Sequence, residues 1–111
     1  MNERYERQMK KGVFEMLVLK LLESEEKYGY QLINEMKEKS NSTFLLKEGT
    51  LYPILYRLED EGLVESKWSE PEGKQQPRKY YMITDKGRGQ LSEIIYIWEQ
   101  ISIGVEHIMK R

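Results

Sequence analysis

Residues 47–58 read KEGTLYPILYRL, and this stretch decides the fold. Its apolar side chains recur at helical spacing and predict one buried face, formed by Leu51, Ile54, Leu55 and Leu58. Pro53 fits the first turn of a helix, where its missing N–H costs little, and Gly62 suits the position just past the C-terminus. We therefore predict a helix that runs from Glu48 to Glu61.

The opposite face of this helix carries groups that can contact nucleic acid. It offers a hydroxyl, two phenols, a proline and a guanidinium, from Thr50, Tyr52, Pro53, Tyr56 and Arg57. Helices read base edges through side chains near their N-terminal end, and the positive end of the helix dipole favours phosphate. An ordinary amphipathic surface helix would carry a similar pattern, so the residues that follow decide between the two interpretations.

These following residues predict a β-hairpin. Residues 63–68 alternate loosely, and residues 79–84 are rich in β-forming side chains. Three cations lie in or beside the intervening loop, where a hairpin would hold them out from the domain: Lys74, Arg78 and Lys79. Such charges suit phosphate contacts or the minor groove. A solubilising turn is the alternative, and it explains Lys74 more easily than the combined charges and rings of residues 78–81.

Two helices are predicted before this segment. The first spans residues 9–22, where apolar side chains recur at helical spacing, and the second begins at Tyr28 and ends near residues 40–42. The chain order is then helix, helix, helix, strand, loop, strand, helix. This is a mainly α protein with a small two-stranded antiparallel hairpin. Because two short strands cannot build a core of their own, the hairpin must pack on the helices, as in a winged helix-turn-helix.

The last predicted helix begins at Thr84 or Asp85 and carries an unbroken apolar seam. Spacings of three and four residues join Leu91, Ile94, Trp98, Ile101, Val105 and Ile108. One small domain cannot easily bury so wide a stripe, so we predict a homodimer formed through this helix. Packing against the helix at 9–22 is the alternative. We expect one compact unit with two parts, a winged helix-turn-helix over 1–84 and a dimerisation helix over 85–111.

The composition excludes several other classes of protein. The chain has 111 residues, a net charge of −1 and no cysteine, so disulfides, thiolate metal sites and cysteine nucleophiles are excluded. It has one histidine, His107, so His-rich metal sites and most general-base schemes lack their usual residue. We predict no cofactor, no metal and no catalytic site. Residues 67–90 carry six basic and three acidic side chains, a local charge of +3 that suits contact with phosphates.

The same composition predicts where the protein acts. No apolar run approaches the roughly 18 residues of a membrane span, and residues 1–11 lack a signal sequence. The absence of cysteine suits a reducing compartment. We therefore expect a cytoplasmic protein with no membrane partner.

Five short motifs occur in one order along most of the chain: YGY at 28–30, GTLYPILYRLE at 49–59, GLV at 62–64, RKYY at 78–81 and TDKG at 84–87. Together they resemble the PadR family of bacterial transcriptional regulators, in its short form with a single C-terminal helix. The resemblance implies a homodimeric winged helix-turn-helix repressor. Such a protein binds a pseudo-palindromic operator in double-stranded DNA and is released by a ligand or a stress signal.

The resemblance also implies roles for individual residues. Those implied at the DNA are Thr50, Pro53, Tyr56 and Arg57 on the recognition helix, Tyr28 and Tyr30 near the backbone, and Lys74, Arg78 and Lys79 on the wing. Lys47 stands where the family often has a small capping residue, which weakens the cap and adds a charge that can contact phosphate. Residues 73–77 read GKQQP, so the wing is less basic than a Gly-Arg-Pro-Arg-Lys version would be.

A ligand site is implied as well. Some short members of the family carry a tryptophan midway along the last helix, where the dimer encloses an apolar cavity for flat aromatic compounds. Trp98 occupies that place, and the flexible side chains of Met9 and Met16 would line the same cavity. The resemblance therefore implies that the protein binds a planar apolar effector. A filled dimer core without a cavity is the alternative. Two other functions stay open: an interaction module without specific DNA binding, and a small-molecule sensor whose DNA role is secondary.

Overall fold

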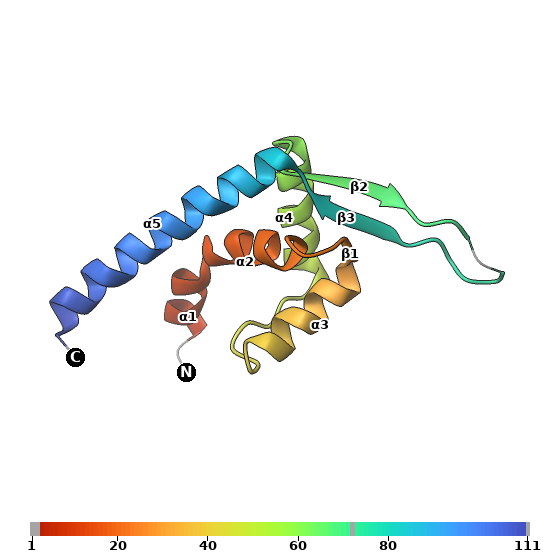
Figure 1. Cartoon of the computed structure of the whole chain (residues 1–111). Coiled ribbons are helices and arrows are strands. Elements are labelled where there is room, and N and C mark those ends of the chain that lie inside the picture. Colours follow the sequence, from red (N-terminus) through yellow and green to blue (C-terminus); the bar gives the residue numbers. More distant parts are fainter. Residues whose placement is uncertain (1–2, 72, 111) are drawn as a thin grey trace.

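The computed structural model describes residues 3–71 and 73–110, which form helices packed around one small sheet (Figure 1). The helices are α1 (Glu3–Lys10), α2 (Val13–Leu22), α3 (Gly29–Lys39), α4 (Glu48–Asp60) and α5 (Asp85–Met109). The strands are β1 (Lys27–Tyr28), β2 (Val64–Trp68) and β3 (Lys79–Ile83), in the order β1-β3-β2 with both pairings antiparallel. The predicted mainly α winged-helix fold with a long last helix is confirmed.

Two details of the prediction are wrong. The expected single helix over 9–22 is broken: α1 ends at Lys10, and Gly12 has a φ of +85° in front of α2. A left-handed residue cannot continue a right-handed helix, so the chain turns there. The hairpin also has a third strand, because Lys27 and Tyr28 pair with Tyr81 and Tyr80. A two-residue strand is too short to have a periodicity, which is why the sequence did not reveal it.

The core lies where α2, α3, α4 and the first turns of α5 meet. Its most deeply buried apolar side chains are Val18, Leu19, Leu22, Leu32, Leu51, Leu55, Leu58, Val64 and Leu91. Tyr81 of β3 is fully buried beside them, so the sheet packs on the helices as expected for strands this short. Lys27 is also buried; its amino group donates to the Leu21 carbonyl and lies 3.6 Å from a Glu35 carboxylate oxygen.

The start of α5 is fixed by close backbone contact. The Thr84 hydroxyl caps the helix, accepting from the Gly87 N–H at 3.0 Å and donating to the Gly62 carbonyl at 2.7 Å. The Thr84 N–H donates to the Leu63 carbonyl at 3.0 Å. A Cβ on Gly87 would lie only 2.1 Å from that same carbonyl oxygen, so only glycine permits this approach. The junction sets the direction in which α5 leaves the domain.

Two elements project from opposite sides of the molecule, the distal half of α5 and the β2–β3 hairpin (Figure 1). Figure 1 shows the distal half of α5 extending away from the other helices on one side, and the β2–β3 hairpin extending on the other. The first half of α5 packs against α2. Among the described residues, no helix combines the length and apolar character that crossing a membrane requires.

Candidate nucleic-acid interface

The helix α4 presents three distinct faces. Leu51, Ile54, Leu55 and Leu58 are buried, as predicted. At 100° per residue, the positions directly opposite are Gly49, Pro53, Tyr56 and Asp60, and all four are exposed. Thr50 and Arg57 are exposed on the flank that faces α1 and α2. The most exposed line of α4 therefore contains Pro53 and Tyr56 among the predicted contacts, with Thr50 and Arg57 beside it.

Tyr52 lies on the other flank, which corrects its expected place on the outer face. It is half-buried, and a Cβ on Gly29 would lie 2.4 Å from its hydroxyl oxygen. Burial raises the pKa of this phenol, and the nearby Glu48 carboxylate adds to the rise. The ring lies 6.0 Å from that of Tyr56. Tyr52 therefore packs α4 against the start of α3, and Gly29 is the residue that makes room for it.

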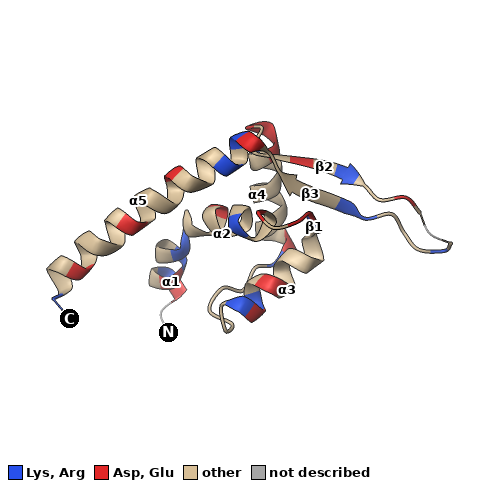
Figure 2. Ribbon diagram, viewed as in Figure 1, with Lys and Arg blue, Asp and Glu red and all other residues tan. Residues whose placement is uncertain are grey.

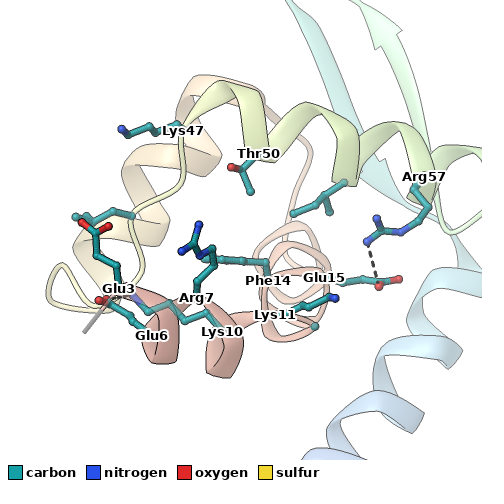
Figure 3. A pocket seen from close by; sticks show the side chains of 13 residues that line it. Glu3, Glu6, Arg7, Lys10, Lys11, Phe14, Glu15, Lys47, Thr50 and Arg57 are labelled. Carbon is teal, nitrogen blue, oxygen red and sulfur yellow. Dashed lines mark hydrogen bonds and ion pairs between the residues drawn. The ribbon is translucent and has the colours of Figure 1, made fainter. Parts of the chain in front are cut away.

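Arg57 is held by an acid from another helix. Its guanidinium lies 3.4 Å from the carboxylate of Glu15 on α2, as the dashed line in Figure 3 marks. Both side chains retain contact with solvent, at 52% exposure for Arg57 and 27% for Glu15. An exposed pair of this kind contributes about 0–1 kcal/mol, so a DNA phosphate or base can compete for the guanidinium.

The start of α4 agrees with the predicted weak cap. Lys47 is the N-cap residue, and its side chain makes no capping hydrogen bond. The side chain is exposed, and no ion pair to it is found within the part of the chain described. Its charge is therefore available next to the positive end of the α4 dipole, where an anion is favoured.

The wing is joined to α4 through Lys79. Its amino group lies 5.8 Å from the ring centroid of Tyr56, 6.0 Å from that of Trp68 and 5.5 Å from that of Tyr81. A lysine among aromatic faces is stabilised by cation–π attraction of about 0.5–1 kcal/mol at exposed sites. The residue is half-buried, so it acts as a link between wing and recognition helix as well as a charge.

Arg78 joins the wing to α3 in a similar way. Its guanidinium carbon lies 4.6 Å from the ring centroid of Tyr28, and the rings of Tyr28 and Tyr80 pack edge to face at 5.4 Å. Tyr28 comes directly before α3, where its N–H donates to the Gln31 side chain at 3.1 Å. Tyr30 in the first turn of α3 is 62% exposed. Of the two predicted backbone contacts, Tyr28 thus lies beside the predicted wing contact Arg78, and Tyr30 is exposed.

The free end of the hairpin carries the remaining wing charge. Figure 2 shows Lys and Arg on both strands where the wing leaves the domain. Lys67 on β2 is paired with Glu26 at 3.1 Å, whereas Lys74 in the loop is exposed. The stem is closed by Ser69, whose N–H donates to the Arg78 carbonyl at 2.7 Å and whose hydroxyl accepts from the Arg78 N–H at 2.8 Å.

The predicted dimer seam on α5 divides into two parts. Leu91 is 1% exposed and belongs to the core of its own chain, and Ile94 is half-buried against that core. The other four seam residues are exposed: Trp98 at 45%, Ile101 at 56%, Val105 at 50% and Ile108 at 83%. The expectation that Leu91 faces a partner is therefore wrong, because the first half of α5 packs on α2.

The two methionines predicted to line the ligand site, Met9 and Met16, do not lie together. Met16 lies in the core of the chain, and Met9 on α1 is 76% exposed. The turn at Gly12 comes between them and sends α1 in a different direction from α2. Met16 therefore cannot line a pocket between subunits without leaving the core, whereas Met9 remains at the surface with Trp98.

A helical pair, α3 and α4, followed at once by the β2–β3 hairpin defines a winged helix-turn-helix protein. Residues 18–93 match the Transcriptional regulator PadR-like family, and the chain belongs to this family. The family is one of transcriptional regulators, not of enzymes.

Solved structures of similar proteins agree with this assignment. A PadR-like transcriptional regulator from Bacillus cereus is 36% identical, with a TM-score of 0.79 over 94% of this chain and 98% of that one. A transcriptional regulator from Clostridium thermocellum is 27% identical, with a TM-score of 0.84 over 90% and 96% of the two chains. Bacillus subtilis PadR, solved in complex with operator DNA, is 28% identical with a TM-score of 0.68; the match covers 76% of this chain and 47% of that one.

Proposed function

We propose that this protein is a homodimeric transcriptional repressor that binds a pseudo-palindromic operator in double-stranded DNA. The observation that carries the proposal is the exposed line of α4, with Pro53 and Tyr56, joined through Lys79 to a projecting wing. A helix of this kind enters the major groove while a wing lies along the adjacent backbone. The operator complex of the similar Bacillus subtilis PadR supports DNA as the partner.

The proposed contacts fall into two groups. Thr50, Pro53, Tyr56 and Arg57 would contact base edges or the groove wall from α4. Tyr28, Tyr30, Lys47, Lys74, Arg78 and Lys79 would contact phosphates around it. Tyr52 is left out of both groups because it packs against α3.

The second subunit would be held by the distal half of α5. Trp98, Ile101, Val105 and Ile108 leave about half or more of their surface uncovered within one chain. Complete burial of an apolar side chain of this size contributes about 1.5–3 kcal/mol, so four such residues per subunit favour a partner of the same kind. In this proposal residues 1–84 form the DNA-binding part and 85–111 the dimerisation part. Residues 1, 2, 72 and 111 lie outside the described residues.

A planar apolar effector would bind between subunits beside Trp98. Two indoles that face each other can stack a flat ring between them, adding about 0.5–1.5 kcal/mol beyond area burial. Met9 is the remaining candidate wall, since Met16 lies in the core. Release from DNA requires that the ligand bind the form that does not fit the operator more tightly than the form that does.

The test is a DNA-binding titration read by fluorescence anisotropy, with an operator obtained by selection from random duplexes. We expect Tyr56→Ala to weaken operator binding by about 1–3 kcal/mol and binding to random DNA much less. Lys74→Ala should weaken both equally and lower the salt slope by about 1. If the protein binds no DNA duplex at low salt, the proposed repressor is refuted, and an interaction module without DNA binding becomes the better interpretation.

A further inference from the structure

A groove separates α1 from the recognition helix α4, and the proposed DNA contacts Lys47, Thr50 and Arg57 lie along one side of it. Its volume is about 710 Å³, within the range of small-molecule sites. Phe14, Leu45 and Ile54 give it an apolar surface, contributed by α2, the segment before α4, and α4 itself. Figure 3 shows α1 forming the opposite wall, with Arg7 extending from α1 toward α4 and Thr50 pointing back toward it.

The side chains around this groove carry an excess of positive charge. Five cations and three carboxylates line it: Arg7, Lys10, Lys11, Lys47 and Arg57 against Glu3, Glu6 and Glu15. Lys10 is paired with Glu6 at 2.6 Å, and Arg57 with Glu15 at 3.4 Å. In the part of the chain that the structure describes, no ion pair is found for Arg7, Lys11 or Lys47.

We propose that this groove binds an amphiphilic organic anion, a molecule with one carboxylate or sulfonate on an apolar body. The apolar surface would take the body out of water, and the cations without partners would contact the charge. DNA phosphates have no apolar body, so the contact of Phe14 and Ile54 with the groove favours a small molecule over the nucleic-acid backbone. A neutral apolar molecule of the same size would leave the three cations unused.

Binding in the groove would act on α4 directly. Thr50 and Arg57 belong both to the groove and to the flank of the recognition helix. An anion near Arg57 would compete with Glu15 for the guanidinium and with DNA for the same charge. The α1 wall joins α2 through the turn at Gly12, and none of its own residues is buried. Its Lys10 amino group donates to the Thr43 carbonyl and lies 5.3 Å from the Phe44 ring centroid, so a ligand that displaces α1 must weaken these contacts. This effect on DNA rests on the proposed function, whereas binding of the anion does not.

The binding test uses decanoate as the probe and methyl NMR of the full-length protein as the readout. We expect a saturable shift of the Ile54 methyl signals, which report the groove, and no comparable shift at Ile108, which is 83% exposed on distal α5. Arg7→Gln should weaken decanoate binding by about tenfold. Arg88→Gln is the matched control, because Arg88 is exposed on α5 and does not line the groove; it should leave the affinity unchanged.

Three results would overturn the proposal. They are the absence of a saturable shift at Ile54, equal binding of decyltrimethylammonium, and an Arg7→Gln variant that binds decanoate as tightly as the parent. A DNA titration with and without decanoate then separates the two proposals. Loss of DNA affinity with decanoate would support both. A protein that binds decanoate at Ile54 but no DNA would retain the groove site and refute the repressor.

Discussion

Gly87 offers the sharpest test of how the fold is assembled. In Gly87→Ala the new Cβ would lie 2.1 Å from the Leu63 carbonyl oxygen and 2.8 Å from the Cγ1 atom of Ile83. Real Cβ atoms essentially never approach other atoms closer than 3.0 Å, so α5 and the Leu63 backbone must separate by at least 0.9 Å, the difference between 3.0 and 2.1 Å. The neighbour is backbone and cannot turn aside as a flexible side chain would.

The expected loss of stability follows from three contributions. Overpacking of this kind costs about 1–3 kcal/mol. The Leu63 carbonyl also accepts from the Thr84 N–H at 3.0 Å, a hydrogen bond of about 0.5–1.5 kcal/mol that the displacement weakens. The higher helix propensity of alanine offsets up to about 1 kcal/mol of this loss in the free energy of unfolding. We expect a net decrease of about 1–3 kcal/mol in the free energy of unfolding.

Gly89→Ala is the matched control, two residues further along the same helix. A Cβ there meets no atom within 4 Å, so only the propensity gain applies and stability should rise by up to about 1 kcal/mol. The assay is urea unfolding of both variants at one protein concentration, because association makes apparent stability concentration-dependent. If the two variants change stability in the same direction and by the same amount, the close contact at Leu63 does not limit the junction.

Three further outcomes can be measured on the same protein. Burial raises the pKa of Tyr81 to about 12, above the usual value near 10, so the folded state favours the neutral phenol. Its contribution to the free energy of unfolding is therefore complete below pH 10 and is lost as the pH rises from about 10 to 12. The buried hydroxyl has no hydrogen-bond partner among the described residues, so Tyr81→Phe should keep or raise stability at neutral pH and flatten the alkaline loss in a pH series of unfolding. Glu15→Gln should change stability by less than about 1 kcal/mol and tighten DNA binding in an anisotropy titration, but leave it unchanged when Arg57 is already Gln. Replacing Ile101 and Ile108 with Asp should give folded monomers in sedimentation, with helical circular dichroism retained, because neither side chain contributes to the core; a monomeric parent protein would contradict the proposed dimer.

The parts of the fold that were predictable from sequence are those with a repeating physical signal. The buried face of α4 follows from four apolar residues at helical spacing, and Gly62 marks its C-terminal end. The placement of Pro53 in the first turn was wrong, because α4 begins at Glu48 and Pro53 lies inside the helix. Thr84 and Asp85 were the two candidate caps of α5, because the side chain of either can accept from a helix N–H; the structure shows that Thr84 is the cap. These signals are local, so the rest of the fold does not need to be known before they can be interpreted.

The missed features depend on contacts between distant residues. Strand β1 has two residues, and it exists because Tyr80 and Tyr81 lie where they can pair with it. The attachment of Lys79 to three aromatic rings requires α4, β2 and β3 to meet, which no single stretch of sequence reveals. Gly12 was visible as a glycine, but a helix tolerates one at a cost of about 1 kcal/mol, so its positive φ was not predictable.

The seam on α5 explains why one sequence pattern can have two physical consequences. Leu91 and Ile94 continue the same spacing as Ile101 and Ile108, yet the first pair packs on its own chain and the second faces solvent. The first pair, with the tight junction at Gly87, fixes the direction of α5 relative to α4. In the proposed dimer, pairing of the distal halves would then fix the two α4 helices relative to each other. Operator half-sites lie about 34 Å apart along one face of DNA, so that spacing must be set by a rigid element. A seam confined to the distal half could join two subunits but could not orient them; the proximal half, buried within each chain, supplies the orientation.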